Sequence, residues 1–174
     1  NTTINANTAQ GGGGGINNES GTLTVYNSTL SANGALSAVI TDGGGGLRIR
    51  AGTTTVLNST IVNNTAPSSR GGGVFNGSLD FSVGNSVIAG NSAATGASVY
   101  NSNGVFKSRG HNVFGENGVS GLSNANTVAG DSVLPGALGT AVGPLANNGG
   151  PTLAQLPVAG GPLIDAGDNA LAQS

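Results

Sequence analysis

Apolar and polar residues alternate along this chain over short stretches, which glycine and asparagine separate from one another. The first thirty residues contain three such stretches, TTIN, GGINN and GTLTVY. Alternation with a period of two residues is typical of β-strands, whereas an amphipathic helix places apolar residues three and four positions apart. No window of this chain has the helical spacing. The pattern therefore predicts a protein built almost entirely from short strands.

The strand pattern repeats, and asparagine sets its register. A leading asparagine opens NTTI, NSTL, NSTI, NSVI and NVFG, with spacings of 26, 31, 27 and 27 residues. A second asparagine follows six residues later in the first four copies. Repeats of 20 to 50 residues indicate a solenoid, in which each repeat is one structural unit. The leading asparagines are Asn1, Asn27, Asn58, Asn85 and Asn112, and the second ones are Asn7, Asn33, Asn64 and Asn91.

Glycine runs recur in the same register, as GGGGG at Gly11–Gly15, GGGGL at Gly43–Leu47, GGGV at Gly71–Val74 and GASV at Gly96–Val99. A flexible linker has no reason to recur at intervals. A phosphate-binding loop needs a Lys-Ser/Thr pair or a helix after the glycines, and neither is present. Glycine permits positive φ and close backbone approach, so we interpret each run as a corner of the solenoid.

Three short strands per repeat of about 27 residues predict an all-β fold, a right-handed parallel β-helix of about four coils over residues 1–118. Coils stack about 4.8 Å apart, so equivalent residues lie above one another. Alignment on the leading asparagine predicts columns of side chains that point into the core. At the fourth coil these columns end in small side chains, so the regular core is predicted to end near Gly118. The inward columns are Val25, Val56, Val83 and Gly110, and Leu23, Thr54, Phe81 and Ser108. The outward columns are Thr24, Thr55, Ser82 and Arg109, and Thr22, Thr53, Asp80 and Lys107.

The outward alignment predicts a surface ion pair between Asp80 and Lys107 on adjacent coils. The leading asparagines are predicted to form a structural ladder, because asparagine tolerates a left-handed corner and its amide both donates and accepts hydrogen bonds. In-register amides bond to each other in the ladders of cross-β structures. The predicted ladder consists of Asn27, Asn58, Asn85 and Asn112.

Two segments interrupt the repeat. Residues 119–174 hold five of the six prolines and three charged residues, which predicts a non-repetitive capping segment of the same domain, folded over the last coil. The alternative is a segment that reaches a neighbouring molecule. The corner insertion Gly34–Asp42 is the longest of its kind. Its apolar residues Leu36, Val39 and Ile40 form either a small extra strand on the solenoid or a self-association patch.

The composition excludes several classes of partner and binding site. The 174 residues suit one domain, and a net charge of −2 with only 7% charged residues makes nucleic acid and anionic membranes poor partners. No cysteine is present, so disulfides and thiolate metal sites are excluded. No apolar run reaches the roughly 18 residues of a membrane span. The 174 residues contain no signal-like segment, so we expect that any export signal has been removed.

The chain offers few groups for catalysis. Glycoside hydrolysis needs two neighbouring carboxylates, and a lyase needs a base. The chain has seven carboxylates, and the repeat register places three of them, Glu19, Asp42 and Asp80, in different columns, so stacking does not gather them. The others are Glu116, Asp131, Asp165 and Asp168. Asp165 and Asp168 favour a turn or cap, and His111 has no aligned triad partner. We therefore predict no enzyme, no cofactor and no metal site.

Two other surface patterns are explained most simply without a specific function. Arg48 and Arg50 alternate with apolar residues and are expected on one outer face, where solubility is the simplest role, although they could meet a sugar acid or a neighbour's carboxylate. Thr22-Leu-Thr24 and Thr53-Thr-Thr55 resemble the flat threonine array of ice-binding proteins. The array breaks at Asp80 and Ser82 in the next coil.

The repeats resemble those of bacterial surface proteins with right-handed parallel β-helices, among them the polymorphic outer-membrane proteins. GGGV at Gly71–Val74 and FGEN at Phe114–Asn117 loosely match their short motifs. SRGHNVFGENG (108–118) and VGPLANNGGPTLAQLPVAGGPLIDAGD (142–168) are similar to the ending of choice-of-anchor Q proteins. The resemblance implies an exported, surface-associated solenoid and supplies no catalytic residue.

Together these observations predict a non-enzymatic extracellular or cell-surface solenoid, an adhesin-like or fibre subunit. The sequence begins inside the repeat pattern without a polar cap, so we expect this end to be covered, either by upstream residues of a longer precursor or by another molecule. In the second case the expected cover is a second copy, with copies stacking head to tail into a homo-oligomer or filament. A surface glycan is a further possible partner. The alternatives are a carbohydrate-binding or polysaccharide-processing β-helix and an ice-binding protein.

Overall fold

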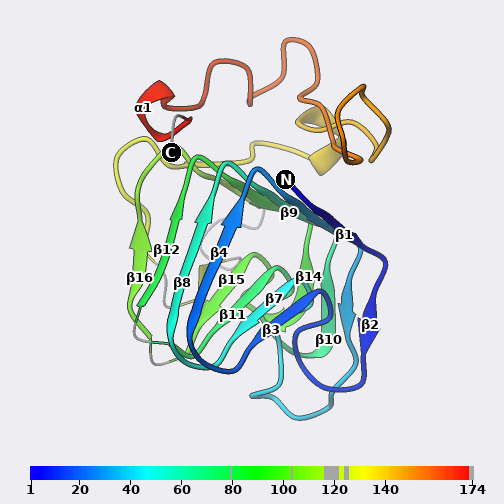
Figure 1. The fold of residues 1–174 in the computed structure, drawn as a ribbon, viewed down its shortest axis with the longest axis vertical. Coiled ribbons are helices and arrows are strands. Elements are labelled where there is room, and N and C mark those ends of the chain that lie inside the picture. Colours follow the sequence, from blue (N-terminus) through cyan, green and yellow to red (C-terminus); the bar gives the residue numbers. More distant parts are fainter. Residues whose placement is uncertain (79, 103, 116–121, 124–125, 173–174) are drawn as a thin grey trace.

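The protein is a parallel β-solenoid of about four coils with almost no helix. The structure is a computed structural model that describes residues 1–78, 80–102, 104–115, 122–123 and 126–172. Every pairing between its strands is parallel, and each strand pairs with its counterpart one coil away. Figure 1 shows the coils stacked side by side, with the C-terminal segment lying across one side of the stack.

Each coil contributes to four sheets, one more than the sequence predicts. Sheet A contains β1 (Thr3–Asn5), β5 (Thr29–Ser31), β9 (Thr60–Val62), β13 (Val87–Ala89), β17 (Val113–Phe114) and β19 (Ser132–Val133). Sheet B, which the sequence did not reveal, contains β2 (Thr8–Ala9), β6 (Gly34–Ala35), β10 (Thr65–Arg70) and β14 (Ser92–Thr95). Its strands are short and rich in Gly, Ala, Ser and Thr, so they show no alternation of apolar and polar residues.

The other two sheets correspond to the remaining predicted strands. Sheet C contains β3 (Ile16–Asn18), β7 (Leu47–Ile49), β11 (Val74–Asn76), β15 (Val99–Asn101) and β18 (Leu122–Ser123). Sheet D contains β4 (Thr22–Tyr26), β8 (Thr53–Leu57), β12 (Asp80–Gly84) and β16 (Phe106–Ser108). Strands β18 and β19 continue sheets C and A past the predicted core end at Gly118, which itself lies outside the described residues.

The core confirms the predicted inward columns for three coils and corrects the fourth. Val25, Val56 and Val83 pair in register and are buried. In the fourth coil Val83 pairs with Ser108 rather than Gly110, and Phe81 pairs with Phe106 rather than Ser108. The predicted alignment is therefore wrong by two residues at β16.

This register fills one of the two inward columns in the fourth coil. The Phe106 ring lies 5.6 Å from that of Phe81 and 6.2 Å from that of Phe114, measured between centroids. The predicted loss of bulk therefore does not occur in the Phe81 column, whereas in the valine column Ser108 follows Val83 and the bulk is lost. The same shift places Lys107 opposite Ser82, yet its Nζ still reaches Asp80 Oδ1 at 2.7 Å, because the long side chain extends diagonally to the neighbouring strand. The predicted ion pair is thus confirmed with a different geometry.

The leading asparagines form left-handed corners, with φ of 48° at Asn27, 50° at Asn58 and 53° at Asn85. Asn85 Nδ2 donates to Asn58 Oδ1 at 2.8 Å, so one rung of the predicted ladder is present. In the fourth coil His111, with φ of 57°, takes the corner position. Asn112 lies one column further along and accepts the Ser86 N–H at 3.0 Å, so its predicted place in the ladder is wrong.

The continuous amide ladder is made by the second asparagines instead. Asn33 and Asn64 are fully buried. The backbone N–H and the Nδ2 of Asn33 both donate to Asn64 Oδ1, at 2.9 and 3.0 Å, and Asn64 repeats the two bonds to Asn91 Oδ1 at the same distances. Asn64 Nδ2 also donates to the Leu30 carbonyl at 3.0 Å. This ladder stabilises the corner between sheets A and B.

The glycine runs are corners, as predicted. Gly44 and Gly71 have φ of 80° and 66°, a region that side chains disfavour. At Gly45 the limit is space, because an added Cβ would lie 2.4 Å from the Thr65 carbonyl oxygen of the next coil. Only glycine allows the coils to approach this closely here.

The C-terminal strap, residues 135–172, covers the outer face of sheet A rather than the last coil. It includes η2 (Leu138–Thr140) and α1 (Asn169–Ala172). Leu138, Ala141 and Leu163 of the strap pack with Val87, Ala89 and Val113 of the sheet. The strap also reaches the first coil, where Thr3 Oγ1 donates to the Leu153 carbonyl at 2.5 Å. Parallel sheets are usually covered on both faces, so these apolar outer residues explain why the predicted cap lies on the side.

Within Gly34–Asp42 only Gly34–Ala35 form a strand, β6, and this is the second coil's regular strand of sheet B. Leu36, Val39 and Ile40 lie beyond this strand and are 48%, 55% and 48% exposed, so the predicted extra strand does not include them. We call residues 36–42 the corner loop. In the described residues, no helix is long and apolar enough to cross a membrane.

Candidate functional site

One end of the solenoid presents the unpaired side of four strands. β1, β2, β3 and β4 each lie at the edge of their sheet, and we call this set the first-coil edge. Ile4, Ile16 and Leu23 are only partly buried there, although they pack against the core. They line a hollow of about 120 Å³ together with Val25 and Leu30. The edge therefore combines free backbone groups with an apolar centre.

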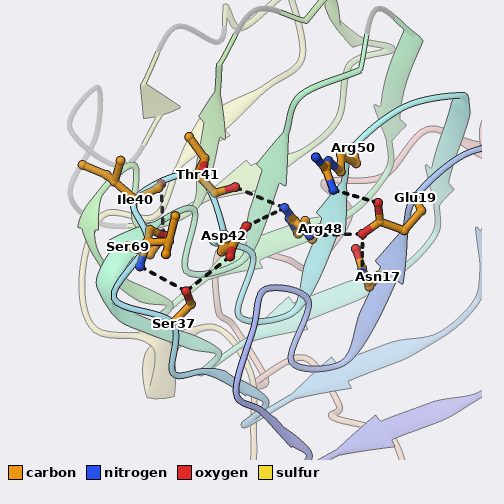
Figure 2. A network of polar contacts seen from close by, with 10 residues as sticks. Asn17, Glu19, Ser37, Ile40, Thr41, Asp42, Arg48, Arg50 and Ser69 are labelled. Atoms are coloured by element: carbon orange, nitrogen blue, oxygen red, sulfur yellow. Dashed lines mark hydrogen bonds and ion pairs between the residues drawn. The ribbon is translucent and has the colours of Figure 1, made fainter.

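The corner loop is held by a buried arginine, as Figure 2 shows. Arg48 of β7 donates from Nη2 to Asp42 Oδ1 at 2.7 Å and to the Thr41 carbonyl at 3.4 Å. Its Nη1 lies 3.2 Å from Glu19 Oε1, and Arg50 Nη1 lies 3.2 Å from Glu19 Oε2. Stacking does not bring Glu19 and Asp42 together, as expected, but both carboxylates contact Arg48. Their columns do differ, but the Arg48 side chain is long enough to bridge them.

The other side of the corner loop is fixed by the third coil. Ser69 Oγ bonds to the carbonyl oxygens of Val39 and Ile40, both at 3.1 Å. Within the loop, Ser37 Oγ donates to Asp42 Oδ2 at 3.4 Å and accepts the Val39 N–H at 3.0 Å. The loop backbone is thus held between coils, while the three apolar side chains remain exposed. Their role as a self-association patch stays a prediction.

The two surface carboxylates that join coils have lowered pKa values. The pKa of Glu19 lies below its ordinary value of 4.5, mainly because Asn17 Nδ2 donates to Oε1 at 2.9 Å, with a further contribution from Arg50 and Arg48. The pKa of Asp80 lies below 3.8 because Lys107 and Thr53 donate to it. In both cases the folded protein favours the ionised carboxylate.

We expect Glu19→Gln to reduce the sensitivity of stability to acid. A carboxylate whose pKa is lower in the folded than in the unfolded chain stabilises the fold at neutral pH, and this contribution is lost as the pH falls through the lowered value. The loss of stability from about pH 5 downward should therefore be smaller in the variant than in the original protein, as urea unfolding measures. NMR titration of Asn17→Ala should show a raised Glu19 pKa. A Glu19 that titrates at 4.5 in the unmodified protein would contradict the assignment.

The residues considered for catalysis lie along the strap. Asp168 N donates to Asn85 Oδ1 at 2.9 Å, and Asp168 Oδ1 accepts the Ala170 N–H at 2.8 Å at the start of α1. Asp165 has a positive φ of 56°, and His111 Nδ1 lies 3.0 Å from the Ala166 carbonyl oxygen. All three thus take part in positioning the strap. The described residues contain no group of three or more His, Cys, Asp or Glu side chains arranged for a metal ion, and Glu116 lies outside them.

Two residues that shape these features carried no sequence signal. A column of serines joins successive coils, because the backbone N–H of Ser28 donates to Ser59 Oγ and that of Ser59 donates to Ser86 Oγ. Asp131 accepts the Asn112 backbone N–H at 3.0 Å and so places a carboxylate at the end of this column. Gln155 belongs to the strap and lies beside sheet A. Neither belongs to a repeat, so no alignment of coils could have found them.

These features define the class of protein: a parallel β-solenoid of about four coils with a clamped corner loop and a lateral strap. A scan against protein-family models, a search of curated proteins and a search of solved structures each find no match to this chain.

Proposed function

We propose that the protein is a non-enzymatic structural solenoid of the extracellular space or cell surface, an adhesin-like or fibre subunit whose copies stack end to end. The proposal commits to a second copy, rather than to residues that precede Asn1 in a longer protein, as the cover of the first-coil edge. Unpaired strand edges pair readily with other strands, and natural proteins normally cover them. Here the edge also leaves Ile4, Ile16 and Leu23 partly exposed, so covering it buries apolar surface as well.

The opposite end of an identical solenoid is a suitable partner for this edge. Its sheets end at β19, β14, β18 and β16, one strand for each strand of the first coil. Such a contact joins two different surfaces, and a contact of this kind extends into a fibre when it does not close into a ring. A net charge of −2 on 174 residues produces little repulsion between stacked copies.

The proposed location rests on sequence resemblance. The repeats resemble those of polymorphic outer-membrane proteins, and residues 108–118 and 142–168 resemble the ending of choice-of-anchor Q proteins. Both resemblances favour an exported protein at a bacterial surface. The exposed corner loop is a second contact that could strengthen the joint between copies.

Stacking predicts that Leu23→Glu weakens self-association, because it places a charge in the apolar centre of the first-coil edge. Light scattering over a range of concentrations should show growing particles for the unmodified chain, with negative-stain images of filaments. The variant should need at least about tenfold more protein for the same particle size. Circular dichroism confirms that it is folded.

Val39→Glu is the matched control, since it adds the same charge to the exposed corner loop. We expect it to weaken association less than Leu23→Glu. A stable monomer at high concentration for the unmodified chain contradicts stacking. Loss of association in Val39→Glu alone would assign the contact to the loop.

A further inference from the structure

Five asparagines of the chain are followed directly by glycine, the sequence in which an asparagine side chain loses its amide nitrogen most readily. Glycine has no Cβ, so its backbone nitrogen can approach the preceding side chain without steric hindrance. Two of the five lie outside the described residues, and the other three lie in the described part of the chain. The five are Asn33, Asn76, Asn103, Asn117 and Asn148, of which Asn103 and Asn117 are not described.

Two of the three described pairs are held between coils. Asn33 and Asn76 are fully buried. The nitrogens of the glycines that follow them, Gly34 and Gly77, donate to carbonyl oxygens of the preceding coil at 2.8 and 2.7 Å. These nitrogens are the atoms that would have to attack the asparagine side chain. Reaction at either pair therefore requires local unfolding of the solenoid.

The third pair lies in residues 146–154 of the strap, which we call the strap tip. In Figure 1 the strap crosses the side of the solenoid above β9. The two end residues of the tip exchange two backbone hydrogen bonds of 3.0 Å, and Asn148 and Gly149 lie exposed between them. Gly149 N donates to Oδ1 of the exposed Asn147 at 3.0 Å. Rotation of this one exposed side chain frees the nitrogen, and no coil has to unfold.

We propose that Asn148 is a site of spontaneous deamidation and that the reaction loosens the strap tip. The Gly149 nitrogen gives up its proton and bonds to Asn148 Cγ, the Cγ–Nδ2 bond breaks, and the side-chain nitrogen leaves as ammonia. Water then opens the resulting succinimide ring at one of its two carbonyl carbons, which yields aspartate or isoaspartate. Overall, one water molecule is consumed and one ammonia molecule is released.

The new carboxylate removes a hydrogen bond that closes the tip. In the unmodified chain Asn148 Nδ2 donates to the Ala154 carbonyl at 2.8 Å. An ionised carboxylate only accepts hydrogen bonds, so it cannot replace this donor and repels the carbonyl oxygen. The neighbouring Leu153 carbonyl accepts the Thr3 hydroxyl at 2.5 Å, so the tip also joins the strap to β1. Deamidation therefore weakens the attachment of the strap to the first coil, and this effect does not depend on stacking of copies.

Peptide mapping by mass spectrometry, after incubation of the full chain in mildly alkaline buffer, tests the site. We expect deamidation of Asn148 to be at least about tenfold faster than that of Asn33 or Asn76, which react only through local unfolding. The same chain in concentrated urea is the control, and there the three asparagines should react at similar rates. Equal rates in the folded protein, or an Asn148 that reacts in urea and stays intact in the folded protein, overturn the site.

Hydrogen-exchange NMR of two variants tests the effect on the strap tip. Asn148→Asp reproduces the aspartate product and should speed exchange of the Ala146 and Ala154 amide protons about tenfold. Asn147→Asp is the matched control, since it adds the same charge one residue earlier and keeps an oxygen that accepts the Gly149 N–H. It should exchange like the unmodified chain, and circular dichroism confirms that both variants are folded. Unchanged exchange in Asn148→Asp, or equally faster exchange in both variants, contradicts loosening through the lost donor.

Discussion

Replacing Val56 with aspartate is expected to unfold the solenoid. Val56 lies in β8 in the middle of the stack, pairs with Val25 and Val83, and has no exposed surface. An unpaired carboxylate at such a position costs several kcal/mol whether it is ionised or protonated. Domains of this size are stable by only about 5–15 kcal/mol, so the loss is a large share of the total. Far-UV circular dichroism and urea unfolding measure it.

Thr24→Asp is the control for this substitution, since Thr24 is exposed on the outer face of sheet D, one residue before Val25. It adds the same carboxylate to the same sheet and should change the unfolding midpoint little. A Val56→Asp protein with the original midpoint would mean that the valine column is not the core.

Replacing Asn64 with leucine is expected to destabilise the protein by about 3 kcal/mol or more. The side chain keeps a similar volume, but three buried partners lose their hydrogen bonds: the backbone N–H and Nδ2 of Asn33, and the Leu30 carbonyl. Each buried group left without a partner costs about 1–3 kcal/mol. Urea unfolding at neutral pH measures the loss.

Asn7→Leu removes the same chemistry at the exposed end of the ladder. Asn7 donates to Asn33 Oδ1, at 3.1 Å from its backbone and 3.0 Å from Nδ2, and its Nδ2 also donates to the exposed Asn5 carbonyl at 3.2 Å, so its replacement leaves no buried donor without a partner. Its cost should be about 1 kcal/mol or less. If both substitutions lower the free energy of unfolding equally, burial does not determine how much the asparagine ladder stabilises the fold.

The leading asparagines recur five times and the second ones four times, and the sequence favoured the leading ones as the ladder. Only the structure shows which asparagines face inward: Asn64 is fully buried, whereas Asn27 is exposed. The same holds for the candidate contacts. The apolar loop residues Leu36, Val39 and Ile40 were recognisable because apolar side chains in a corner insertion are unusual. The role of Arg48 was not recognisable, because its partners Glu19 and Asp42 lie in other columns.

The sequence by itself determined the class of fold, the positions of most strands and the register of three coils. These depend on local preferences, namely alternation within a strand and the tolerance of asparagine and glycine for corners. The tertiary structure decided the rest. The register of β16 follows from the packing of Phe106 against Phe81, and His111 takes a corner that the repeat assigns to asparagine. The strap lies on sheet A because Val87 and Val113 need cover there, a demand that arises only when the coils are stacked.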